Sequence, residues 1–263
     1  MVSDEASAEA IRKRFGLASY DAAVVLGSGW GPLLDAWPDP IAATTYAEVG
    51  LRPPVAPGHA GQLVAFEHKG HRTLVFSGRT HLYEGHGPAE VSRNVRVAAA
   101  LGVKTLVLTN ANGALFQDWP LGQIMMLTDH LNLTGTSPLH GATFVDLTET
   151  YSLGLRQRAR HEAELDGIDL VEGIYAMLPG PHYETAAEAR AISLLGAQAL
   201  GMSSVLEAIE ARAHRMDVLA LSTVTAHEAS GEIIDPDEVV EIAGREAGRL
   251  GPSIWRLIEG LGV

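Results

Sequence analysis

Hydrophobic residues along this chain occur in short continuous runs that alternate with stretches of helical periodicity. Residues 22–26 form an apolar run before a glycine, as expected for a strand buried on both faces. Lys69-Gly70 separates two strand-like runs and predicts a hairpin turn. The expected strands are 22–26, 62–67, 72–76, 105–109, 124–127, 168–177 and 218–225. The expected helices are 3–15, 88–101, 184–195, 203–214 and 237–250.

This alternation predicts an α/β fold with a central mixed, largely parallel β-sheet flanked by helices. No repeat, low-complexity tract or linker divides the chain, so a single domain spanning residues 1–263 is the simplest interpretation. Apolar residues make up 46% of the sequence, which is ample for a large core.

Composition and charge exclude several classes of protein. The chain has no cysteine, which excludes disulfides, thiolate metal sites and a thiol nucleophile. Its net charge of -13 argues against nucleic-acid binding, because a polyanion would be repelled. No apolar run approaches the roughly 20 residues that span a bilayer, and the acidic N-terminus does not fit a secretory signal. We therefore expect a cytoplasmic protein with no membrane partner. We expect no metal either, since His68 and His71 have no carboxylate at a suitable spacing.

Loops with chemically active residues follow several of the expected strands, where ligands gather in such folds. The loop 27–31, Gly-Ser-Gly-Trp-Gly, would let the backbone approach an anion, with Ser28 adding a hydroxyl. Arg79, His81 and Tyr83 alternate, so an extended segment would point all three to one side, which suits an oxyanion. The structural alternatives are a tight turn and a solvated loop with a salt bridge.

Two further segments supply a carboxylate and a hydroxyl at expected helix starts. Residues 178–185, Leu-Pro-Gly-Pro-His-Tyr-Glu-Thr, place Glu184 after a turn, and residues 201–204, Gly-Met-Ser-Ser, place a hydroxyl before a helix. Together they suit a nitrogenous base beside a phosphate. Taken singly, each is more often a plain loop or a helix cap.

Taken together, these blocks resemble the trimeric purine nucleoside phosphorylases over nearly the whole chain. The matching blocks are 27–31, 78–85, 110–113, 180–185 and 200–203, in the family's order and spacing. The resemblance implies phosphorolysis of purine ribonucleosides and deoxyribonucleosides to the free base and (deoxy)ribose 1-phosphate. Inorganic phosphate is the implied co-substrate, with no cofactor and no metal.

The resemblance also implies roles for individual residues. The implied phosphate ligands are Ser28, Arg79, His81, the backbone amide of Ala111, and Ser203. The implied nucleoside contacts are His59, Tyr83, Phe144, Tyr183, Glu184 and Met202. Phe144 would reach the site of a neighbouring subunit in a homotrimer, and Glu184, His81 and Arg79 would serve catalysis.

Two departures from the family pattern bear on the substrate. Where the family has a base-contacting asparagine, this chain has Ala226, and a family histidine that meets the ribose 5′-hydroxyl aligns with Pro236. Asn112 and His227 are candidate replacements for the lost amide. Alternatively, Asn112 caps its turn and His227 faces solvent.

We therefore expect a purine nucleoside phosphorylase with a weakened preference for 6-oxopurines. One alternative is a 5′-methylthioadenosine phosphorylase, which the loss of a 5′-hydroxyl partner would suit but which lacks a glutamate at the position of Glu184. The other is a nucleoside-binding protein with little turnover, which would have no use for an orthophosphate site.

Overall fold

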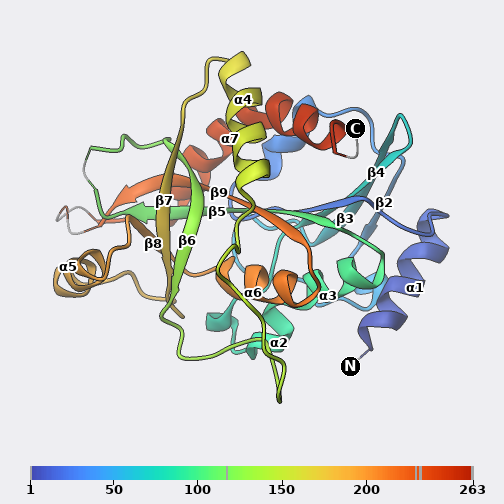
Figure 1. Ribbon diagram of the computed structural model, residues 1–263, viewed down its shortest axis with the longest axis horizontal. Helices are drawn as coiled ribbons and strands as arrows, with labels where there is room; N and C mark the ends of the chain where they lie inside the picture. The colour runs from blue at the N-terminus through green and yellow to red at the C-terminus, as the bar shows by residue number, and fades with distance from the viewer. Residues whose placement is uncertain (1, 117, 229, 231–232, 262–263) are drawn as a thin grey trace.

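Nine strands form one mixed sheet in the computed structural model of the protein, which describes residues 2–116, 118–228, 230 and 233–261 (Figure 1). The strands are β1 (Ala22–Val25), β2 (Ala42–Thr45), β3 (Gln62–His68), β4 (His71–Ser77), β5 (Thr105–Ala114), β6 (Ile124–Asn132), β7 (Leu170–Met177), β8 (Ala199–Gly201) and β9 (Asp217–His227). The α-helices are α1 (Asp4–Phe15), α2 (Pro88–Val91), α3 (Arg93–Ala100), α4 (Leu153–Leu165), α5 (Ala186–Leu194), α6 (Val205–Ala213) and α7 (Pro236–Glu259). The 3-10 helices are η1 (Gly31–Ala36), η2 (Ala47–Val49) and η3 (Leu82–Glu84).

The strand order is β2-β3-β4-β1-β5-β8-β7-β6-β9, and β5 also pairs with β9, which closes the last five strands into a ring. Five of the nine strand pairings in the described residues are parallel, so the predicted mixed, largely parallel sheet is confirmed. Strand β5 pairs in parallel with both β1 and β9, so the carboxyl ends of these three strands lie at the same edge of the sheet.

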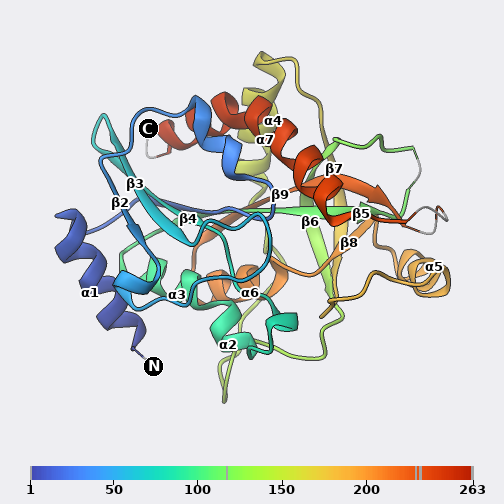
Figure 2. The same cartoon turned by 180° about the vertical axis from the view of Figure 1, so that it is seen from behind.

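Helices cover both faces of this sheet. Figures 1 and 2 show α4 and α7 on one side, α1, α3 and α6 on the other, and α5 at one end. Strand β1 explains the continuous apolar run, because Ala23 and Val25 pack in the cluster with α1, α3 and α6, whereas Val24 packs with α4 and α7. No helix among the described residues is long and apolar enough to cross a membrane.

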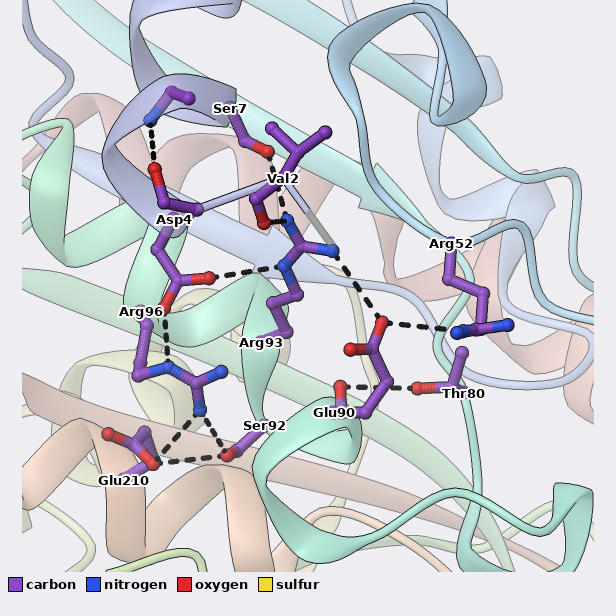
Figure 3. A network of polar contacts seen from close by, with 12 residues as sticks. Val2, Asp4, Ser7, Arg52, Thr80, Glu90, Ser92, Arg93, Arg96 and Glu210 are labelled. Carbon is purple, nitrogen blue, oxygen red and sulfur yellow. Dashed lines mark hydrogen bonds and ion pairs between the residues drawn. The ribbon is translucent and has the colours of Figure 1, made fainter.

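The helix expected over residues 88–101 is divided at Ser92, whose Oγ lies 3.0 Å from both the Pro88 carbonyl and a carboxylate oxygen of Glu210. Figure 3 shows the polar network around this break. Arg93 and Arg96 both pair with Asp4, at 3.1 and 2.7 Å. The network therefore joins α1 to α3 and α6 without entering the sheet.

The last helix was expected to end at residue 250, but α7 continues through Pro252 to Glu259. A proline inside a helix costs about 3 kcal/mol. Ile254, Leu257 and Ile258 are buried beyond it, and each contributes roughly 1.5–3 kcal/mol. Burial therefore outweighs the lost hydrogen bond, and Trp37 Nε1 donates to the Gly251 carbonyl at 3.1 Å.

Other boundaries differ in ways that matter for the site. Strand β5 extends to Ala114 and β9 to His227, so residues 110–113, expected in a loop, lie within a strand. Helices α5 and α6 begin two residues later than expected, which leaves Glu184 and Ser203 in the preceding segments. Strands β2 and β8, helix α4 and the 3-10 helices were not among the expected elements.

Candidate active site

A pocket opens where the ends of β1, β5 and β9 meet the segments before α5 and α6. All but two of the predicted site residues line it, and the two exceptions are His59 and Phe144. The predicted residues in its lining are Ser28, Arg79, His81, Tyr83, Ala111, Asn112, Tyr183, Glu184, Met202, Ser203 and Ala226.

Arg79 is buried at one end of this pocket, where protein groups fix its guanidinium. Its Nη1 donates to the Thr109 carbonyl at 2.5 Å and its Nη2 to the Val25 carbonyl at 3.2 Å. Its Nε lies 2.8 Å from Oε2 of Glu207, and both side chains are almost completely buried. A guanidinium has five N–H groups, so these three contacts orient the fork and still leave donors for an anion.

The loop after β1 brings Ser28 beside this arginine. Gly27 makes the approach possible, because a Cβ there would lie 2.5 Å from the Thr109 carbonyl oxygen and 2.9 Å from Arg79 Nη1. Ser28 Oγ lies 3.3 Å from Nε2 of His59. A hydroxyl and a guanidinium therefore converge on the same end of the pocket.

His81 is held in a defined tautomer by Glu84. The carboxylate Oε1 accepts from the His81 backbone N–H at 2.8 Å and lies 3.1 Å from Nδ1. Because a carboxylate accepts, Nδ1 carries the proton and Nε2 is left for a ligand. Burial lowers the pKa of His81, opposed by its hydrogen bond to Glu84. A neutral ring at pH 7 accepts at Nε2 from a phosphate O–H or a sugar hydroxyl.

His59, expected to contact the nucleoside, lies beside Ser28 and His81. Its ring centroid is 5.3 Å from that of His81, and its Nε2 meets Ser28. Burial, followed by His81 and Arg79, lowers the pKa of His59 to about 2. The imidazole is therefore neutral across the physiological range.

Ser203 and the start of α6 complete this end of the pocket. Ser203 is buried and lines the pocket, and Ser204 follows with a positive φ of 73°. Ser204 makes no side-chain cap to α6, and its Oγ accepts from Asn110 Nδ2 at 2.9 Å. The first-turn amides of α6 are thus not satisfied by a capping side chain, which favours an anion there.

Glu184 also lines the pocket. Both of its carboxylate oxygens are buried, and neither has a hydrogen-bond partner among the described residues. Burial raises the pKa of Glu184. Gly180 packs this segment onto the pocket floor, because a Cβ at that position would lie 3.1 Å from Cγ of Met202 and 3.2 Å from Cδ1 of Tyr83. Tyr183 is half-exposed at the rim.

Asn112 has one end engaged and one end open. Its Nδ2 donates to Ser222 Oγ at 2.6 Å, and Ser222 Oγ in turn donates to Asn110 Oδ1. Oδ1 of Asn112 is buried without a partner among the described residues. Oδ1 therefore offers the pocket an acceptor, and one of the two N–H groups of Nδ2 is committed to Ser222 on β9.

Ala226 lines the pocket and has no side-chain donor for a base. Neither His227 nor Pro236 lines the pocket. His227 Nε2 donates to the Trp119 carbonyl at 2.6 Å. Pro236 is the first residue of α7, after the N-cap Asp235.

Glu228 is a pocket residue that the sequence reading missed. It is 6% exposed, and burial, followed by Glu184, raises its pKa to about 7. The sequence contained a signal for this residue. Glu228 follows Ala226 by two residues at the end of an expected strand, and side chains two residues apart in a strand point to the same side.

Phe144 lies outside the pocket and is 93% exposed in the single chain. Singly exposed apolar side chains such as this one are common on protein surfaces. The described residues contain no group of three or more histidine, aspartate or glutamate side chains that could hold a metal ion.

Comparisons with known proteins identify the family of the chain. The family model of the phosphorylase superfamily matches residues 21–259. The chain is 47% identical over 248 residues to the purine nucleoside phosphorylase of Mycobacterium tuberculosis, covering 93% of this chain and 91% of that protein. It is 38% identical over 245 residues to the enzyme of Bos taurus, covering 86% and 84%. The solved structure of the Schistosoma mansoni enzyme in complex with adenosine matches with a TM-score of 0.89 at 30% identity, covering 99% and 97%.

Proposed function

The chain belongs to the phosphorylase superfamily and, within it, to the purine nucleoside phosphorylases. We propose which residues of its pocket bind phosphate and which bind the purine. The protein is an enzyme, a pentosyltransferase that cleaves purine nucleosides with phosphate. One end of the pocket, with Ser28, Arg79, His81 and Ser203, holds the phosphate. The other end, with Glu184, holds the purine.

The observation that supports this assignment is that hydrogen-bond donors and a buried carboxylate line the same pocket. Arg79, Ser28 and Ser203 supply donors to the pocket, and Glu184 supplies a buried carboxylate that has no partner among the described residues. Unpaired buried oxygens are costly, so Glu184 requires donors that a ligand brings. A purine with a ring N–H supplies them, and the ribose then spans the distance between base and phosphate.

Catalysis follows from binding phosphate and the nucleoside next to each other in a fixed orientation. Phosphate bound by Arg79 and Ser203 lies beneath the anomeric carbon and stabilises the oxocarbenium character of the transition state. The C–N bond to the purine breaks, the C–O bond to phosphate forms, and the departing base takes up the electron pair. Glu184, which accepts from the ring N–H, fixes the base during departure.

The finer features of the enzyme remain proposals. Residues 1–263 act as one nucleoside phosphorylase domain, with phosphate as co-substrate and no cofactor. The protein forms a homotrimer in which the exposed Phe144 closes the ribose part of the adjacent site. Location in the cytoplasm stays a prediction from the sequence.

A substrate panel tests the function. Inosine, guanosine, adenosine and 5′-methylthioadenosine are each incubated with the enzyme, with and without inorganic phosphate, and free base is measured. We expect base release only with phosphate, and faster release from inosine and guanosine than from methylthioadenosine. Faster release from methylthioadenosine would favour the alternative phosphorylase, and binding without release would favour a nucleoside-binding protein.

A further inference from the structure

We propose that Glu228 is a specificity-determining residue of the base end, where its neutral carboxyl group donates a hydrogen bond to the purine. The inference deepens the proposed function and rests on it, since it requires a purine beside Glu184. Glu228 then supplies a donor beside Ala226, which has none, and beside His227, whose Nε2 is engaged with the Trp119 carbonyl.

The fold holds this carboxyl group in the pocket. Glu228 is 6% exposed, and its backbone N–H donates to the Ala114 carbonyl at 2.9 Å, which fixes the end of β9 against β5. Gly113 leaves the space that the side chain fills, because a Cβ there would come within 2.7 Å of both Cγ and Cδ of Glu228. The carboxyl group therefore lies on the backbone of β5, at the same end of the pocket as Glu184.

The surroundings of Glu228 favour its protonated form. Burial and Glu184 raise the pKa of Glu228 to about 7, and no cation appears among the causes of that shift. His227, the nearest ring in sequence, is engaged with the Trp119 carbonyl. The ionisable groups that face this region from the neighbouring segments are Tyr183 and Glu184 before α5, and Asp235 and Glu238 at the start of α7.

Two carboxyl groups in one desolvated pocket share a proton, since both cannot ionise cheaply. Glu184 as the carboxylate accepts an N–H, and Glu228 as the acid donates an O–H. The edge of a 6-oxopurine presents the complement, a ring N–H next to a carbonyl, with N7 as a further acceptor. The bond from Glu228 strengthens as the departing base gathers negative charge, and the proton stays on Glu228.

The sign of the pH effect follows. Below pH 7 Glu228 keeps its proton and the donor is present. As the pH rises through about 7, the donor is lost and a second carboxylate faces an electron-rich base. The kcat/KM for inosine should therefore fall above pH 7 through this group.

The experiment compares the wild-type enzyme with Glu228→Gln, which keeps a donor that does not titrate, and Glu228→Ala, which has none. The kcat/KM for inosine is measured from about pH 5.5 to 8 and expressed as the ratio of variant to wild type, which cancels the ionisation of phosphate. The Gln-to-wild-type ratio should rise roughly tenfold per pH unit above 7, and the Ala variant should lose about tenfold or more at pH 6. With 7-methylguanosine, whose base departs from a cationic ring, the Ala variant should lose much less.

A Gln-to-wild-type ratio that is constant with pH, together with an Ala variant as active as wild type, would overturn the proposal. If the variants do not fold, calorimetry on the wild type replaces them: hypoxanthine binding near pH 7.5, measured in two buffers, should take up protons, and no uptake would count against the proposal. Failure of the proposed function is distinct, because wild-type enzyme would then release no hypoxanthine from inosine at any pH.

Discussion

Arg79 and Glu207 form an almost completely buried ion pair, with Nε of the arginine 2.8 Å from Oε2 of the glutamate. The arginine follows β4, and the glutamate lies in the first turn of α6, four residues after Ser203. One contact therefore sets the distance between two of the proposed phosphate ligands. A buried pair of this kind costs desolvation energy, which suits a positioning role better than a purely stabilising one.

Glu207→Gln should destabilise the protein by about 3–5 kcal/mol, because it leaves a buried guanidinium without its counter-charge. It should also raise the KM for phosphate more than the KM for inosine. Glu210→Gln is the matched control, since Glu210 lies on the same helix but pairs with Arg96 and Ser92 away from the pocket. Thermal unfolding and steady-state kinetics measure both. Equal phosphate KM values in the two variants would remove the positioning role.

Ser203→Ala should raise the KM for phosphate by about tenfold, since one hydrogen bond to a charged group contributes roughly 1.5–3 kcal/mol. Ser152→Ala removes a serine that caps α4, outside the pocket, and serves as the control. Phosphate saturation curves at fixed inosine distinguish the two. A Ser203→Ala enzyme with unchanged phosphate kinetics would contradict the assignment of Ser203.

Phe144→Ala should weaken nucleoside binding and leave phosphate binding largely intact, because the aromatic side chain would close the ribose part of a neighbouring site. Phe116→Ala, at another exposed phenylalanine, provides the control. Light scattering gives the assembly state, and inosine saturation gives the KM. A fully active monomer would disprove the shared site.

Ala226→Asn should raise the ratio of kcat/KM for inosine to that for adenosine by about tenfold or more, because a new amide donor reaches the base end. Asn112→Ala is instructive beside it. Asn112 donates one of its N–H groups to the buried Ser222 hydroxyl, so its loss should lower stability more than it changes this ratio. An unchanged ratio in Ala226→Asn would mean that this position does not set base preference.

The sequence predicted most of the elements that carry chemistry, because strand-end loops keep short local signatures. The hairpin at Lys69-Gly70 is confirmed, with positive φ at both residues and His68 paired with His71. The pocket gathers Ser28, Arg79 and Glu184 from segments far apart in the chain, and their joint lining follows the parallel strand order.

Features that depend on contacts between residues far apart in the chain could not be predicted from the sequence. The ring of strands depends on β8, three residues long, and on the second half of β5, which reads as a loop but pairs with β9. Pro252 signals a helix end, and only burial on the α7 face overrides it. The hydrogen bonds from Asn112 to Ser222 and from His227 to the Trp119 carbonyl also depend on partners more than 100 residues away.

Product stoichiometry tests most directly whether phosphate attacks the nucleoside within this pocket. Inosine and phosphate are incubated with the enzyme, and hypoxanthine, ribose 1-phosphate and free ribose are quantified together. We predict hypoxanthine and ribose 1-phosphate in equal molar amounts, no free ribose, and no release without phosphate. Free ribose formed mole for mole with hypoxanthine, independently of phosphate, would mean hydrolysis and would contradict the phosphate end assigned to Arg79 and Ser203.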